Sequence, residues 1–215
     1  LLNRSSDLAC TADWETYHGL TDYNKAFYNR DIFFVPHNLN TSNGQNFYRA
    51  FSVTKLTSFP YLDLSNAEDI VWIFHASYKL ASIPSMDFSK VKTAHGAFRY
   101  TEIRTFPKLN FPNCYDFYMA FSENHCRHFP PMDLGTNVTS ADTFSIAKAW
   151  IQNSGNAQLT KESVENIIAS LYNTRNYADG PEKTSLTTEI GTDGTFTESD
   201  IDNSRIAQIC NDEFG

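Results

Sequence analysis

The most regular feature of the chain is an alternation of apolar and polar positions that repeats about every 23 residues. Prolines recur at intervals of 24, 24, 23 and 23 residues, at Pro36, Pro60, Pro84, Pro107 and Pro130. Phenylalanines keep the same period, at Phe27, Phe51, Phe74, Phe98, Phe121 and Phe144. Two residue types that share one period over this length indicate an internal repeat.

Aligning the copies on their prolines reveals further apolar columns. In the copy around Pro84, apolar residues stand four and one positions before the proline (Leu80, Ile83) and two and four positions after it (Met86, Phe88). A unit of this size cannot bury its apolar face alone, whereas stacked copies share one continuous core. The period also lies within the range of leucine-rich repeats.

We therefore predict an α/β repeat solenoid of leucine-rich-repeat-like coils of about 23 residues, with a short strand over the four residues before each proline. Proline has no N–H for a strand ladder, so it should lie just outside the strand. The phenylalanines should fill the space between neighbouring coils. The predicted repeat core is Phe51, Phe74, Phe98, Phe121, Pro60, Pro84, Pro107 and Pro130.

A short polar residue stands three positions after most of the prolines: Asp63, Asp87, Asn110 and Asp133. Such side chains commonly hydrogen-bond nearby backbone in a recurring turn, which is the interpretation we favour. A ladder of calcium sites is the alternative, because stacked carboxylates can share cations. No glycine-rich nonapeptide accompanies these residues.

Residues 151–215 have a different pattern, which predicts a small helix–strand–helix cap. Thr160 is a suitable N-cap for a helix whose apolar positions are spaced at three and four residues. A strand is expected over 184–190, and Thr197 should begin a second helix. The open end of a solenoid exposes core and edge, so it needs a cap. The predicted organisation is an N-terminal capping segment over 1–25, the solenoid over 26–150 and the cap over 151–215.

Charge and hydropathy narrow the function classes. The 215 residues carry a net charge of −8, and residues 151–215 hold 4 basic and 11 acidic residues, a net of −7. An acidic chain without a basic patch is not expected to bind nucleic acid. Its longest apolar run is too short for a membrane-spanning helix, so no membrane association is expected.

Chemical motifs are scarce, and we predict neither a catalytic site nor a bound metal or cofactor. The closest approach to a metal cluster is the segment His125-Cys126-Arg127-His128. Cys126 falls on an apolar column of the repeat, as does Cys114, so both are expected to be buried thiols. All four cysteines, Cys10, Cys114, Cys126 and Cys210, are predicted to be free.

One column of exposed residues is the predicted binding surface. Two positions in each predicted strand do not belong to the core, and their character changes from aromatic through hydroxylic to basic along the copies. The predicted binding residues are Phe33, Ser58, Ser82, Arg104, Arg127 and His128. An ordinary solvated surface is the alternative interpretation of this column.

Two stretches resemble BspA-like leucine-rich repeats, whose unit reads roughly L-x-x-I-P-x-L-D-x-S-x-V after a Met-Phe and a Cys. They are Leu56-Thr-Ser-Phe-Pro-Tyr-Leu-Asp-Leu-Ser-Asn66 and Leu80-Ala-Ser-Ile-Pro-Ser-Met-Asp-Phe-Ser-Lys-Val91. The family's cysteine is absent here and Phe often replaces Leu. The stretch 159–171 is similar to the helix that follows such repeats in bacteriophage tail and other virion proteins, and 196–207 resembles the second helix of that module.

This resemblance implies a non-enzymatic structural protein of a bacteriophage virion, in a tail, tail fibre, baseplate or other appendage. The implied location is the virion, the implied partners are other virion proteins and further copies of the chain, and host recognition would add a surface receptor. A bacterial cell-surface adhesin domain that binds a protein or glycan is the alternative. An enzyme built on a repeat scaffold is a third option.

Overall fold

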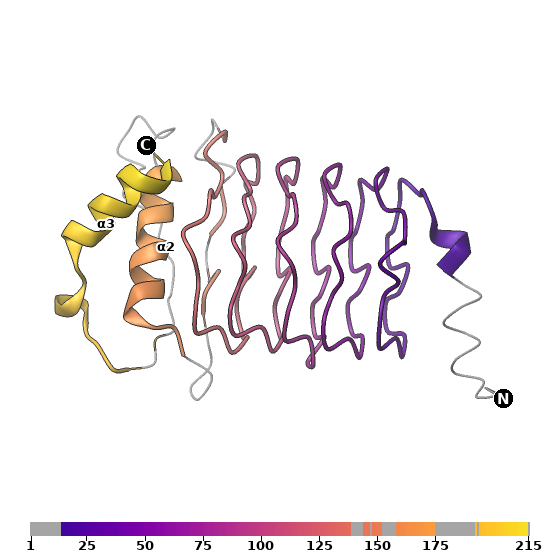
Figure 1. The fold of residues 1–215 in the computed structure, drawn as a ribbon, viewed down its shortest axis with the longest axis horizontal. Coiled ribbons are helices and arrows are strands. Elements are labelled where there is room, and N and C mark those ends of the chain that lie inside the picture. The colour runs from indigo at the N-terminus through magenta and orange to yellow at the C-terminus, as the bar shows by residue number, and fades with distance from the viewer. Residues whose placement is uncertain are drawn as a thin grey trace.

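The computed structural model describes residues 14–138, 144–146, 148–151, 158–174, 192 and 194–214. Figure 1 shows a row of stacked coils, with α2 (Lys161–Thr174) and α3 (Asn203–Ile209) side by side at one end. Three short helical turns complete the described elements, namely η1 (Trp14–Tyr17), η5 (Glu198–Asp200) and the π-helical η6 (Cys210–Phe214). We call residues 19–138 together with 144–146 and 148–151 the coil stack.

The predicted α/β repeat solenoid with strand-containing, leucine-rich-repeat-like coils is wrong. The described residues contain no β-strand and no sheet, and their only α-helices are α2 and α3, both after the coils. Where strands were expected, neighbouring coils meet at isolated parallel bridges, such as those joining Ser58 to Ser82 and Thr105 to His128. The strand expected over 184–190 lies outside the described residues.

The short pairing before each proline has a physical cause. The amide of Phe59 donates to the Ser82 carbonyl at 3.0 Å, and the amide of Ala81 donates to the Thr57 carbonyl at 2.9 Å. The next residue, Pro60, has no N–H, so the ladder cannot continue. Two hydrogen bonds are too few to make a strand.

Most backbone pairing between coils occurs instead in the turn around each phenylalanine. In the second coil, alternate amides at Arg49, Phe51 and Val53 each donate to the next coil at 2.9 Å. The amides between them close turns within their own coil, as Ala50 does to the Phe47 carbonyl at 3.0 Å. The backbone groups are therefore satisfied as in a ladder while the chain keeps turning.

A recurring pair of left-handed residues shapes this turn. The residues two positions before and two after the ring have φ between +54° and +59°: Lys25, Asn29, Arg49, Val53, Trp72, Ala76, Tyr100, Met119 and Glu123. In the fourth coil the first of the pair is Gly96, with φ of +56°. Extended strands require negative φ, so this geometry excludes a strand around the ring column.

Stacked aromatic rings form the centre of the core. Ring centroids along the column from Phe27 to Phe121 are 5.1, 6.0, 5.8 and 5.6 Å apart, and all five rings are buried. Phe144 does not continue the column, contrary to the sequence period. Trp150 does, at 5.6 Å from Phe121, because the last coil is longer, while Phe144 packs against Phe117 at 6.0 Å.

The repeat prolines lie beside this column and are partly exposed: Pro60, Pro84, Pro107 and Pro130. Each follows a buried apolar residue. The ring of Phe59, for example, meets Phe51 at 4.9 Å and Phe74 at 4.8 Å, edge to face in both cases. The residue before the proline therefore fills the space between two neighbouring rings of the column.

Short acidic and amide side chains hold the turns. Asp63 accepts the Ser65 amide at 3.0 Å and its hydroxyl at 2.6 Å, and these bonds lower the pKa of the Asp63 carboxyl. Asp87 accepts the Ser89 amide at 2.8 Å. A second column of side chains, not predicted from the sequence, makes the same kind of bond. Each side-chain oxygen accepts the backbone amide two residues later in the chain at 2.8–2.9 Å, at Asp22, Asn46, Asp69 and Asp116. The turn interpretation is confirmed for Asp63 and Asp87, whereas Asn110 accepts the Asp133 amide of the next coil at 3.3 Å and Asp133 accepts the Thr136 hydroxyl at 2.5 Å.

Candidate functional site

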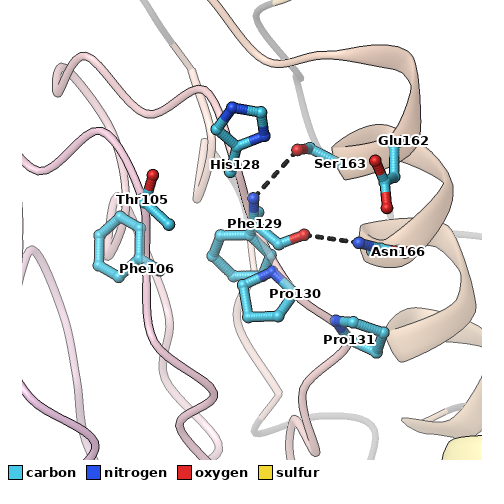
Figure 2. Close-up of a pocket in the computed structure, with 9 residues that line it drawn as sticks. All are labelled: Thr105, Phe106, His128, Phe129, Pro130, Pro131, Glu162, Ser163 and Asn166. Carbon is cyan, nitrogen blue, oxygen red and sulfur yellow. Dashed lines mark hydrogen bonds between the residues drawn. The ribbon is translucent and has the colours of Figure 1, made fainter.

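A cleft of about 280 Å³ lies where the exposed column of the last coils meets helix α2 (Figure 2). The last two coils contribute one side of the cleft, and α2 contributes a polar wall on the other. The lining residues are Thr105, Phe106, His128, Phe129, Pro130, Pro131, Glu162, Ser163 and Asn166.

Helix α2 is held in this position by one polar stripe, at Ser163, Asn166, Ser170 and Thr174, whose spacing of three to four residues places it on one face. The Ser163 hydroxyl donates to the Arg127 carbonyl at 2.8 Å and accepts the Phe129 amide at 3.0 Å. The amide nitrogen of Asn166 donates to the Phe129 carbonyl at 2.8 Å, as the dashed lines of Figure 2 show. The side chains of α2 therefore pair the backbone groups that a further coil would otherwise pair.

The same stripe continues along the edge of the last coil. Ser170 accepts the Met132 amide at 2.9 Å, and the Thr174 hydroxyl donates to the Leu134 carbonyl. An unpaired coil edge would expose its amides and carbonyls to other chains. The polar stripe of α2 closes that edge with side chains.

A second set of contacts holds α2 against α3. Glu165 is only 2% exposed, and its carboxylate accepts the Arg205 guanidinium at 2.8 Å and the Asp202 amide at 2.9 Å. A buried carboxylate is stable only when paired in this way. Asp202 also caps α3 by accepting the amides of Ser204 and Arg205. The second C-terminal α-helix therefore begins at Asn203, and Thr197 starts only the short η5.

The chemistry of the cleft is that of a contact surface. Of its lining residues, Pro130 and Pro131 are apolar and partly exposed, and His128 and Glu162 are exposed, whereas the side chains of Phe106 and Phe129 are buried in the core. The Ser163 hydroxyl is already bonded on both sides, so it is not placed to act as a nucleophile. An apolar side chain with a polar end fits these groups.

The residues predicted to bind lie along one exposed column. Ser58, Ser82, Arg104, Arg127 and His128 are exposed, and the Phe33 side chain is 59% exposed. The bridges place Ser58 beside Ser82 and His128 beside Thr105. Of the predicted residues, only His128 lines the cleft.

The rest of the cleft does not follow from the repeat, because its wall comes from a helix outside the repeat. The signal that was available is the polar stripe of α2 itself. Short polar side chains gather on one face of this helix, at Ser163, Asn166, Ser170 and Thr174. A helix exposed to solvent on all sides does not need its polar residues gathered on one face.

Of the residues considered for metal binding, His125 and Cys126 take structural roles. The His125 imidazole pairs with the Glu102 carboxylate at 2.9 Å. Burial raises the pKa of the Cys126 thiol to about 12 and that of Cys114 further still, so both stay protonated. Cys114, Cys126 and Cys210 are free thiols, and Cys10 lies outside the described residues. Within the described ranges, no three His, Cys, Asp or Glu side chains gather as a metal site would require.

Comparison with protein-family models, with curated proteins and with solved structures gives no match to this chain. In the part of the chain that the structure describes, no helix combines the length and the apolar character needed to cross a membrane.

Proposed function

We propose that the chain is a non-enzymatic structural protein of a bacteriophage virion, in a tail, tail fibre, baseplate or other appendage. The observation that carries the proposal is the exposed column, which runs over successive coils and ends at the cleft beside α2. A surface that extends across many coils suits contact with a large partner. The resemblance of the stretches 159–171 and 196–207 to the closing module of bacteriophage tail proteins supports the choice of a virion.

The charge distribution supports assembly with further copies of the chain. The column ends in the exposed residues Arg104 and Arg127, whereas residues 151–215 carry a net charge of −7. Complementary surfaces of opposite charge favour association and fix its orientation. We therefore expect the basic end of the column to contact an acidic surface on a neighbouring copy or another virion protein.

The alternative is a bacterial surface adhesin domain that binds a protein or glycan. Exposed rings favour it, because Phe33 is 59% exposed and Tyr61 is 63% exposed on the coils. Aromatic side chains at this exposure commonly mark an interaction surface.

Charge reversal in the assembled particle tests the proposal. The double variant Arg104→Glu/Arg127→Glu should reduce incorporation into particles at least tenfold without changing the thermal melt of the isolated chain. Lys79→Glu/Lys90→Glu, at two exposed coil lysines outside the column, is the matched control and should assemble normally. Equal incorporation of both double variants would exclude an assembly role for the column. Recovery of the wild-type chain from a bacterial cell envelope would favour the adhesin.

A further inference from the structure

A second surface stands out on the turns of the second to fourth coils, on the residues that flank the ring column. It consists of Tyr48, Arg49, Trp72, His75, Arg99 and Tyr100, which we call the arginine–aromatic edge. Backbone hydrogen bonds join these coils directly, since Val53 donates to His75 and Ala76 donates to Arg99. We propose that this edge binds a saccharide that carries a carboxylate, with Arg49 and Arg99 as the groups that bind the anion.

Among the residues that the structure describes, neither arginine has an acidic partner. Within the described residues no carboxylate lies within 4.0 Å of either guanidinium, whereas Lys55, Lys92 and Arg205 are paired with acids. The Nε atoms of Arg49 and Arg99 are buried, so a bound carboxylate would reach the terminal nitrogens of each guanidinium. Hydrogen bonds from a guanidinium to a carboxylate are among the stronger ones in proteins.

Both guanidiniums are already oriented. That of Arg49 lies 5.6 Å from the ring centroids of Tyr28 and Tyr48, and that of Arg99 lies 4.5 Å from the Tyr100 ring and donates to its hydroxyl at 3.0 Å. Contacts of this kind hold a guanidinium without neutralising it. Binding therefore requires little further ordering of either side chain.

His75 lies between the two arginines in the stacking order. Burial, together with the positive charges of Arg99 and Arg49, lowers the pKa of His75 to about 4. Both guanidiniums therefore act electrostatically on the same imidazole, and that imidazole is neutral at pH 7. The edge is locally positive on a chain whose net charge is −8.

The aromatic side chains add a surface against which a sugar ring can stack. Trp72 meets His75 at 4.5 Å, His75 meets Tyr100 at 5.6 Å, and Tyr78, which is 63% exposed, lies 6.1 Å from Tyr100. Trp72 lies across Gly96, where an added Cβ would approach its ring to 2.2 Å. The C–H face of a pyranose packs on such rings while its carboxylate reaches a guanidinium. A polynucleotide would instead need a longer run of cations than two arginines.

Calorimetric titration of the full chain tests the proposal, using a glucuronic-acid-containing disaccharide, its neutral glucose analogue and sodium sulfate as probes. We expect the acidic disaccharide to bind at least tenfold more tightly than the neutral one. Arg49→Gln and Arg99→Gln should each weaken this binding at least tenfold, and Arg99→Lys should restore part of it. Arg104→Gln, in the exposed column, is the matched control and should bind as the wild type does.

The aromatic part of the site has its own test. Tyr78→Ala should weaken binding of the acidic disaccharide several-fold and leave any sulfate binding unchanged. Equal affinity for the neutral and acidic sugars, sulfate binding as tight as that of the acidic disaccharide, or unchanged binding in both arginine variants would each overturn the proposal. A circular dichroism melt of every variant confirms that the folded state is being compared. The result is independent of whether the chain assembles into a virion.

Discussion

The coil stack and helix α2 satisfy the same backbone groups by different means. Inside the stack, amides and carbonyls of one coil pair with those of the next, as Phe51 does with Ile73 at 2.9 Å. At its end, the groups of the last coil pair with the side chains of Ser163, Asn166 and Ser170. A repeated unit can therefore extend itself, but a segment of different chemistry must end it.

The largest effect is expected inside the stack. Replacing Phe98 by Ala removes a fully buried ring that contacts Phe74 and Phe121, and should lower the free energy of unfolding by about 3–5 kcal/mol. Urea denaturation measures the change. Tyr78→Ala, at a ring that is 63% exposed, is the control and should change stability by less than about 0.5 kcal/mol. A similar loss of unfolding free energy in both variants would contradict the claim that the ring column forms the centre of the core.

The end of the stack should be nearly as sensitive. Ser163→Ala leaves the Phe129 amide without its buried partner, and should cost about 1–3 kcal/mol by denaturation. The Arg127 carbonyl loses the Ser163 hydroxyl but keeps the Thr160 amide. Ser199→Ala, at an exposed hydroxyl in η5, is the matched control and should have little effect. If Ser163→Ala is as stable as this control, water satisfies the coil edge and α2 does not cap it.

A substitution at a left-handed turn position tests how tightly neighbouring coils pack within the stack. Gly96→Ala places a Cβ at φ of +56° and 2.2 Å from the Trp72 ring, so it should cost about 1–3 kcal/mol in a thermal melt. Trp72 must also move, which changes the intrinsic fluorescence. Gly194→Ala has a similar φ of +74° but open space around it, and separates the backbone effect from the contact with Trp72. Equal costs at the two glycines would show that Trp72 does not pack on Gly96.

Acid should weaken the coils through His75. Its folded pKa of about 4 lies below the usual value of 6.5, so the neutral form stabilises the fold. This contribution is complete above pH 6.5 and is lost as the pH falls from 6.5 towards 4. Urea denaturation across that range should show the decline, and His75→Gln should flatten it. An unchanged decline in the variant would assign the effect to other groups.

The smallest expected effect is a gain in stability. Val53 is β-branched and has φ of +57°, a conformation that such residues adopt only under strain. Val53→Asn should relieve it and stabilise the chain by about 0.5–1 kcal/mol in urea. Val71→Asn, at a partly exposed valine outside the left-handed positions, is the control and should not stabilise. A destabilised Val53→Asn variant would show that packing of the valine outweighs its strain.

The period of the apolar residues is sufficient to locate the stacked rings, but it does not define the backbone. Phe51 and Phe74 were placed in one column by spacing alone, and they stack at 6.0 Å. The left-handed turns were not predicted, because Arg49, Val53 and Trp72 are not residues that mark positive φ. Hydrogen bonding from neighbouring coils imposes this conformation.

The candidate site was predictable only in part for a similar reason. The exposed column follows from the repeat, and His128 was identified in this way. The wall of the cleft comes from Glu162, Ser163 and Asn166, about 35 residues further along the chain and outside the repeat, so no periodicity points to them. Arg49 was also missed, since it looks like an ordinary surface cation in sequence.

Amide hydrogen exchange at the edge of the last coil tests the central claim most directly. If α2 ends the stack, the Phe129 and Met132 amides should exchange as slowly as that of Phe106, which pairs with a coil carbonyl. Ser163→Ala should then accelerate exchange at Phe129, and Ser170→Ala should accelerate it at Met132. Fast exchange of both amides in the wild-type chain, with Phe106 still protected, would contradict the account.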